Sequence, residues 1–292
     1  MHGNPRSGGA GVFCREGTME KKKRSAVSVI RTVAFAALFI AAGYAAVWFI
    51  GSRSHQKDSE DAASRYVKIL SQEGEESSAE STESGEEGGE LHLGVKTNDV
   101  EIDFEGLWEV NEDVVAWIQM PDIYCMDYPV VWSTDEYYLE RTWKGLSSPY
   151  GSIFVEESNS PDFTDYHTIL YGHRMVDRTM FGWIENYLIQ DYYDTHKDII
   201  YIYTPKGRLT YQIFAVEEIN HSDPAVYTVG FCPSPEFETF VNGMLERNRV
   251  DTGVSATPFD RILTLSTCAF VDKDRLTVHA KLIDGYLLEE NG

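Results

Sequence analysis

Two side chains that can act together in acyl transfer lie next to each other in the expected order of strands. Cys268 follows the apolar run 261–266, and Arg275 opens the run 275–283. Adjacent strands would bring the thiol and the guanidinium to the same rim. A thiol has a reference pKa near roughly 8.5, and a nearby cation favours its reactive thiolate form. Arg275 can also stabilise the oxyanion that forms when a thiolate attacks an amide. The pattern predicts a cysteine nucleophile beside a cationic donor.

A general acid and base would complete such a site, and His173 is the best placed of the eight histidines. It follows the apolar run 168–171, and Gly172 is expected to give the chain a sharp exit from that strand. An imidazole there would protonate a leaving amine and deprotonate an incoming one. His279 is the second choice, and His221, in a turn-like stretch, is expected to have no chemical role. Each of the three residues alone would more often be structural, so the prediction depends on their combination.

Short β-like runs through the second part of the chain have to position these side chains. They lie at 151–155, 168–171, 199–203, 209–216, 261–266 and 275–283, and helical spacing is clearer at 104–118, 180–189 and 235–247. Many strands with few helices predict a mainly β fold, a barrel of about eight strands with peripheral helices.

The first third of the chain has the composition of a membrane anchor followed by a tether. Residues 1–31 hold seven Lys or Arg, residues 32–50 carry no charge, and residues 51–97 form an acidic linker rich in Ser, Glu and Gly. The uncharged run nearly matches a bilayer core of roughly 30 Å, and the basic residues before it predict a cytoplasmic N-terminus. The catalytic domain, 98–292, would lie outside the cell on a single-pass anchor. A cleaved signal peptide remains the alternative.

Composition bounds the other function classes. A formal net charge of -22 disfavours nucleic-acid binding. The four cysteines show neither CxxC nor metal-ligand spacing: Cys14, Cys125, Cys232 and Cys268. Pairing of Cys125 with Cys232 stays open. No metal site or cofactor is expected, because no metal-binding motif occurs. Met19, which closely precedes a basic cluster, would be a more ordinary start than Met1.

Taken in order, these motifs resemble the sortase family of Gram-positive cell-surface transpeptidases, and within it class B. The resemblance is carried by TLSTC ending at Cys268, by Arg275 seven positions later, and by YGH ending at His173. Further segments match the class B pattern in order: 128–131, 137–139, 151–154, 235–247 and 280–282. The resemblance therefore covers the whole of residues 98–292.

The resemblance implies that Cys268 cleaves a C-terminal sorting signal after Thr and forms a thioacyl enzyme. His173 would be its acid and base, and Arg275 would hold the substrate carbonyl or oxyanion. The positions that it assigns to the substrate groove are Ser266, Thr267, Tyr171 and Asp135. Asp135 stands where class B members often have Asn, which affects the exact signal that is read.

The partners that the resemblance implies are secreted proteins with an NPQTN-like or LPxTG-like signal and an amine of the peptidoglycan or, less favoured, a pilin Lys. Two other functions remain open: a cysteine endopeptidase that uses water, and a non-catalytic surface adhesin or receptor domain. An L,D-transpeptidase would need an SxGC-type turn, and the STC sequence that ends at Cys268 does not fit.

Overall fold

The computed structural model describes residues 37, 40–43, 57–69, 100–123, 126–196, 198–220, 226–268 and 274–289. Most of the predicted anchor, 32–50, lies outside the described residues. In the part of the chain that is described, no helix has both the length and the apolar character needed to span a bilayer.

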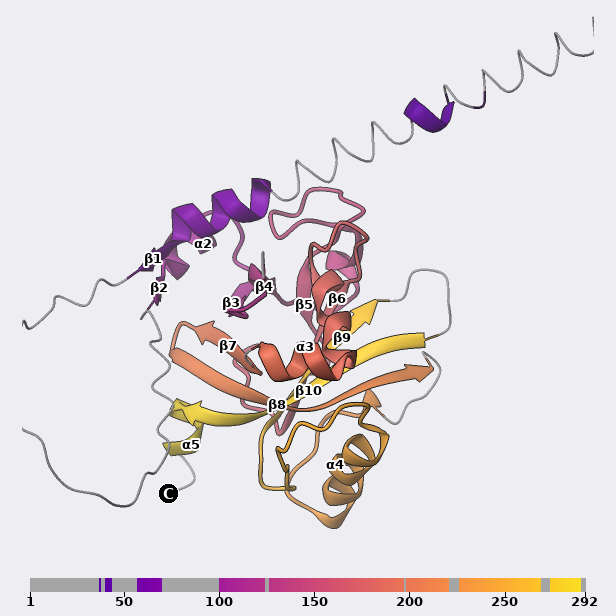
Figure 1. The fold of residues 1–292 in the computed structure, drawn as a ribbon. Helices are drawn as coiled ribbons and strands as arrows, with labels where there is room; N and C mark the ends of the chain where they lie inside the picture. The colour runs from indigo at the N-terminus through magenta and orange to yellow at the C-terminus, as the bar shows by residue number, and fades with distance from the viewer. Residues whose placement is uncertain are drawn as a thin grey trace, which may run out of the picture. The chain divides into compact units, whose positions relative to one another are not determined.

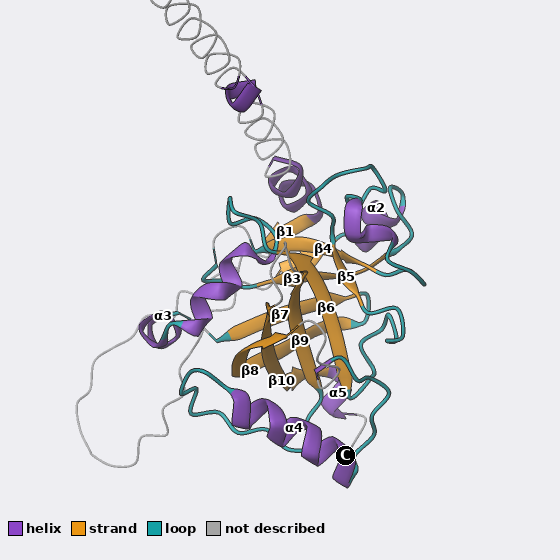
Figure 2. Ribbon diagram, turned by 90° about the vertical axis from the view of Figure 1, so that its right-hand side faces the viewer, coloured by secondary structure: helices purple, strands orange, loops and turns teal. Residues whose placement is uncertain are grey.

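Eight strands close into a barrel with the order β10-β8-β7-β3-β4-β5-β6-β9 (Figures 1 and 2). Their bounds are β3 Val114–Gln119, β4 Asp127–Val131, β5 Ile153–Val155, β6 His167–His173, β7 Ile199–Thr204, β8 Gly207–Asn220, β9 Ile262–Cys268 and β10 Asp274–Gly285. The pairs β4–β5 and β6–β9 are parallel, and the other pairs are antiparallel. The predicted barrel of about eight strands is confirmed.

Buried apolar residues form separate clusters, and two of them lie on opposite sides of β8 and its neighbours. Leu263, Leu265 and Val278 are fully buried in the main core cluster. Phe214 and Ala215 of β8 belong to a separate cluster with residues of α4 (Pro235–Arg247). Figure 2 shows α4 along one side of the barrel, and the sheet is therefore covered there on its outer face.

Apart from α4 and the helical segment 57–66, the peripheral helices are short. They are α2 (Phe104–Trp108), the 3-10 helices η1 (Tyr137–Glu140) and η2 (Phe181–Leu188), α3 (Gln190–Thr195) and α5 (Tyr286–Glu289). The predicted helix 235–247 is confirmed, with the same bounds. It begins here because Ser234 accepts a hydrogen bond from Phe237 N at 3.2 Å and Pro235 occupies the first turn.

The predicted helix 104–118 is wrong beyond Trp108. The chain turns and continues as β3, which pairs with both β4 and β7. β3 is buried on both faces at Ala116, Trp117 and Ile118. Its apolar residues therefore run on without alternation, and this pattern does not distinguish a strand from a buried helix.

The compact unit begins at His55 instead of residue 98. Residues 57–66 are helical, and β1 (Val67–Ile69) pairs antiparallel with β2 (Val100–Ile102). Tyr66 is buried, and its ring meets that of Trp143 edge-on at 6.0 Å. The sequence composition predicts that this segment belongs to the linker. Its buried apolar residues instead pack on the domain, while 70–99 lie outside the described residues.

A soluble chain that starts at residue 98 is expected to be less stable than one that starts at residue 55. Loss of the buried Tyr66 ring alone should lower the free energy of unfolding by about 3 kcal/mol. Chemical denaturation of the two chains measures the difference. Internal deletion of residues 72–90 is the matched control and should leave the unfolding free energy nearly unchanged. Equal stability of the chains starting at 55 and 98 would contradict the packing described for Tyr66.

Candidate active site

Three strand ends meet at one end of the barrel. β6 and β9 run parallel, with His173 and Cys268 as register partners. Neighbouring strands lie about 4.8 Å apart, so the two backbones are adjacent at this point. β10 pairs with β9 on its other side, and Arg275 is the second residue of β10. The predicted positions at the ends of three strands are therefore observed, and the strand order brings them together.

The His173 ring is held by the backbone of η1. Its Nε2 lies 2.7 Å from the carbonyl oxygen of Leu139, which can only accept a hydrogen bond. Nε2 therefore carries a hydrogen, and in the neutral ring Nδ1 is the nitrogen that can take up a proton. Gly151 has φ +60, and a Cβ there would lie 2.9 Å from His173 Cδ2. The close approach of the two segments thus requires glycine at this position.

Gly172 has a different role from the one predicted. It lies inside β6, which continues to His173, so it makes no sharp exit. A Cβ at Gly172 would lie 2.7 Å from the ring of Phe181. The glycine is needed because η2 packs directly against this strand.

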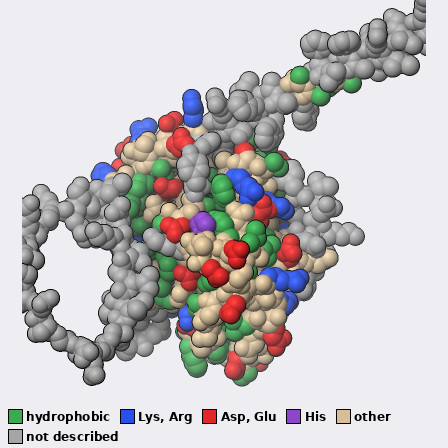
Figure 3. Space-filling view, in the orientation of Figure 1, with side chains coloured by type: hydrophobic (Ala, Val, Ile, Leu, Met, Phe, Trp, Pro, Cys, Tyr) green, Lys and Arg blue, Asp and Glu red, His purple; other side chains and the backbone are tan. Residues whose placement is uncertain are grey.

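A cavity of about 310 Å³ opens beside His173 and Arg275. Its other lining residues are Asp135, Glu136, Leu139, Phe154, Glu156, Glu157 and Tyr171. Two of the predicted groove residues, Tyr171 and Asp135, are among them. Four carboxylates make the wall acidic. Figure 3 shows that acidic side chains are spread over one face of the molecule. The cavity suits an extended peptide or a cationic group.

Arg275 and two tyrosines form one wall of this region. The Tyr171 ring stacks on that of Tyr227 at 6.2 Å, and the Arg275 guanidinium carbon lies 5.6 Å from the Tyr227 ring centre. Arg275 Nε is buried without a hydrogen-bond partner among the described residues, and Arg275 also contributes to the lining of the cavity. Burial, and then the Glu156 carboxylate, raise the pKa of Tyr171, so its hydroxyl stays protonated.

Known proteins share this sequence pattern and fold. The model of the sortase domain matches residues 118–283. The chain belongs to the sortase family. Sortase B of Listeria monocytogenes is 32% identical over 191 residues, which cover 63% of this chain and 76% of that protein. Sortase B of Staphylococcus aureus is 33% identical over 184 residues, covering 62% and 74%. Sortases are cysteine transpeptidases, and this sortase is an enzyme of that kind.

Solved structures show the same similarity to class B. A Staphylococcus aureus sortase B–substrate complex has a TM-score of 0.59 at 30% identity and covers 63% of this chain and 86% of its own. Sortase B from Bacillus anthracis in complex with AAEK2 has a TM-score of 0.62 at 28% identity, covering 80% and 97%.

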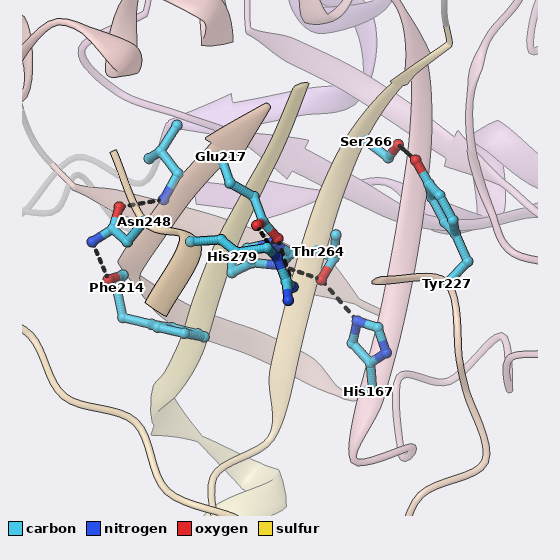
Figure 4. Close-up of polar contacts among 10 residues, drawn as sticks. His167, Phe214, Glu217, Tyr227, Asn248, Thr264, Ser266 and His279 are labelled. Carbon is cyan, nitrogen blue, oxygen red and sulfur yellow. Dashed lines mark hydrogen bonds and ion pairs between the residues drawn. The ribbon is translucent and has the colours of Figure 1, made fainter. Parts of the chain in front are cut away.

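Ser266 and Thr267 do not line the cavity of this sortase. Both side chains are buried, and Ser266 Oγ shares a hydrogen bond of 3.3 Å with the hydroxyl of Tyr227 (Figure 4). Thr267 Oγ1 accepts a hydrogen bond of 3.1 Å from Leu276 N. These contacts tie β9 to its neighbours, and substrate contact by either residue stays a prediction. For Cys268 the structure describes the backbone position at the end of β9.

Other predicted residues lie elsewhere. His279 is fully buried and is bonded to Thr264 and Glu217, so the second choice for the catalytic histidine is wrong. His221 and Cys125 lie outside the described residues, whereas Cys232 is exposed and free. Within the described ranges no three His, Cys, Asp or Glu side chains are grouped to hold a metal.

Tyr227 is a site residue that the sequence analysis does not predict. It lies between β8 and α4, 39 residues before Ser266, and no local motif marks it. Its contacts with Tyr171, Arg275 and Ser266 exist only because the chain returns to the same end of the barrel.

Proposed function

We propose that this sortase cleaves a C-terminal sorting signal after Thr and joins the released acyl group to an amine of the peptidoglycan. The supporting observation is the register pairing of His173 with Cys268 next to Arg275 and the cavity. Among the similar structures, one is a sortase B–substrate complex and another is sortase B complexed with Gly3. Both fit an enzyme that takes a peptide donor and an amine acceptor.

The reaction has two acyl-transfer steps. The Cys268 thiolate attacks the Thr carbonyl carbon, the C–N bond breaks, and His173 gives a proton to the leaving amine. An incoming amine then loses a proton to His173 and attacks the thioester, which releases the thiolate. Arg275 stabilises the oxyanion in both steps. The hydrogen bond from His173 Nε2 to Leu139 supports Nδ1 as the atom that exchanges the proton.

The acidic wall of the cavity supports a cationic acceptor. Asp135, Glu136, Glu156 and Glu157 face the same space as Arg275. Carboxylates raise the local concentration of an ammonium group, an effect that weakens with salt. Asp135 accepts hydrogen bonds from Tyr137 N and from the Ser133 hydroxyl, at 3.0 and 2.9 Å, which orient its carboxylate.

Incubation of soluble residues 55–292 with NPQTN-like and LPxTG-like peptides tests the proposal. In the presence of an amine acceptor, the ligated product should form faster than the hydrolysed one. Dominant hydrolysis at saturating amine would favour an endopeptidase that uses water. If neither peptide is cleaved, the proposed function is wrong.

We also propose that residues 32–50 anchor the enzyme in the cell membrane with the catalytic domain outside. The uncharged run and the basic cluster 21–24 support this topology. The full chain is expected to sediment with membranes and to resist carbonate extraction, while residues 55–292 alone should stay in the supernatant. Protease added to intact cells should degrade the catalytic domain. A protected domain, or a full chain in the soluble fraction, would contradict the proposal.

A further inference from the structure

A chain of hydrogen bonds crosses the sheet beneath α4, on the outer face of the barrel (Figure 4). Its four bonds join Thr228 O to His167 Nδ1 at 2.7 Å, His167 Nε2 to Thr264 Oγ1 at 2.8 Å, Thr264 Oγ1 to His279 Nδ1 at 2.9 Å, and His279 Nε2 to Glu217 Oε1 at 2.9 Å. We call the side chains of His167, Thr264, His279 and Glu217 the buried chain. All four are fully buried.

Aromatic residues and α4 close off the buried chain from solvent. The His167 ring lies 5.0 Å from that of Phe240, and the His279 ring lies 6.2 Å from that of Phe214. Arg247, at the end of α4, donates to Glu217 from Nε at 2.6 Å and from Nη2 at 3.2 Å. A polar group that loses its partner in such surroundings costs about 1–3 kcal/mol. The bonds of the buried chain therefore constrain the strands that carry it.

Each strand that brings a proposed catalytic residue also contributes one member of the buried chain. His167 lies six residues before His173 on β6, and His279 lies four residues after Arg275 on β10. Even spacing along a strand puts both members of each pair on one face of the sheet. Thr264 lies four residues before Cys268 on β9. The same three strands are thus joined side chain to side chain, four to six residues along the strands from the proposed catalytic residues.

At the end of the buried chain opposite Glu217, His167 is hydrogen-bonded to the backbone next to Tyr227. Thr228, whose carbonyl accepts from His167, is the next residue after Tyr227. The Tyr227 hydroxyl bonds Ser266, and its ring lies against Arg275. One set of hydrogen bonds thereby fixes both the three strands and a wall of the site.

Counting hydrogens shows that the buried chain needs one more proton than its neutral groups supply. The Thr228 carbonyl and the Glu217 carboxylate only accept, so four bonds require four hydrogens. Two neutral imidazoles and one hydroxyl supply three. Burial lowers the pKa of His167 to about 3, so this ring is neutral. It donates to Thr228 and accepts from the hydroxyl of Thr264.

The fourth hydrogen then lies between His279 and Glu217. With the Thr264 hydrogen directed to His167, Nδ1 of His279 must donate to Thr264, and Nε2 faces a carboxylate. Burial raises the pKa of Glu217, but hydrogen bonds from His279 and Arg247 outweigh it and lower that pKa. Burial lowers the pKa of His279, and hydrogen bonding to Glu217 opposes this lowering without cancelling it. Because Glu217 stays ionised and Nε2 of His279 faces its carboxylate, the geometry assigns the additional proton to the His279 ring.

We propose that His167, Thr264, His279 and Glu217 are positioning residues: through one shared proton they hold β6, β9 and β10 in the alignment that brings the proposed catalytic residues together. This inference rests on the proposed function, because its main readout is the rate of acyl transfer. None of the four residues touches the cavity that receives the substrate.

Thr264→Val tests the positioning role, because valine keeps the volume and removes the hydroxyl that serves two bonds. We expect kcat for acyl transfer to fall about 10-fold or more, because small misplacements of reacting groups slow the chemical step. KM should change little. Thr264→Ser restores the hydroxyl and should recover most of kcat. Thr277→Val is the matched control: its hydroxyl is buried without a partner among the described residues, and it lies between Arg275 and His279 on β10. It should keep the wild-type rate.

Nitrogen-15 NMR of the histidine rings tests the shared proton without reference to activity. At pH 7 the wild type should show one buried ring with both nitrogens protonated, and this signature should be lost in Thr264→Val. Two neutral buried rings in the wild type would overturn the proposal. So would a valine variant as active as wild type, or a serine variant as slow as valine. Failure of the wild type to cleave any peptide would instead contradict the proposed function.

Discussion

Cys268→Ala is expected to abolish both peptide cleavage and ligation, with a decrease in kcat on the order of 10⁶-fold. The methyl group has no lone pair to attack the Thr carbonyl, so no thioacyl enzyme forms. Product formation is measured by chromatography, and the acyl enzyme is measured by intact mass. Wild type trapped during turnover should carry the mass of the peptide acyl group, and the variant should not.

Cys232→Ala is the matched control for this substitution. Cys232 is exposed and free, and it lies outside the lining of the cavity. Its replacement should leave the rate and the acyl-enzyme mass unchanged. Cleavage by Cys268→Ala at the wild-type rate would show that another nucleophile acts. Slow labelling of Cys268 by iodoacetamide, no faster than that of Cys232, would favour a non-catalytic surface domain.

Arg275→Lys is expected to lower kcat by about 10²- to 10³-fold, even though the positive charge remains. The guanidinium presents several donors in a fixed plane, and a lysine ammonium on a flexible stem does not reproduce that geometry. Arg275 lines the cavity, and its Nε has no hydrogen-bond partner among the described residues. Steady-state kinetics with a sorting-signal peptide measure the loss.

Arg208→Lys is a suitable comparison because Arg208 also lies over a tyrosine, with its guanidinium carbon 5.2 Å from the ring of Tyr201. The guanidinium carbon of Arg275 lies at a similar distance, 5.6 Å, from the centre of the Tyr227 ring. The two substitutions should have similar, small effects on stability, and only Arg275→Lys should slow the reaction. Equal rates for both variants would remove Arg275 from the proposed mechanism.

Local patterns were sufficient for much of the barrel. The runs that became β6, β9 and β10 could be located because apolar, β-branched segments end at polar residues. α4 could be located because Ser234, Pro235 and a 3.6-residue spacing act within one segment. Cys268, His173 and Arg275 could be selected since each stands at the end of such a run. These properties depend on residues a few positions apart.

Local patterns failed where a neighbour from elsewhere in the chain sets the environment. The sequence pattern of β3 predicts a helix because both faces of this strand are buried, by strands from elsewhere in the chain. The composition of 57–69 predicts a linker, since nothing within the segment indicates that the Tyr66 ring contacts that of Trp143. The local sequence predicts that Gly172 allows the chain to leave a strand, whereas the structure shows that glycine is required there by the close approach of the Phe181 ring.

The order of residues along the chain was enough to name a thiol, an imidazole and a guanidinium and to place each at the end of a strand. Their meeting depends on which strands become neighbours. The parallel pairing of β6 with β9 sets His173 beside Cys268, and the antiparallel pairing of β9 with β10 adds Arg275. The buried chain and Tyr227 arise in the same way. Such pairings are selected by the burial of many side chains at once, a sum over distant segments that no single segment contains.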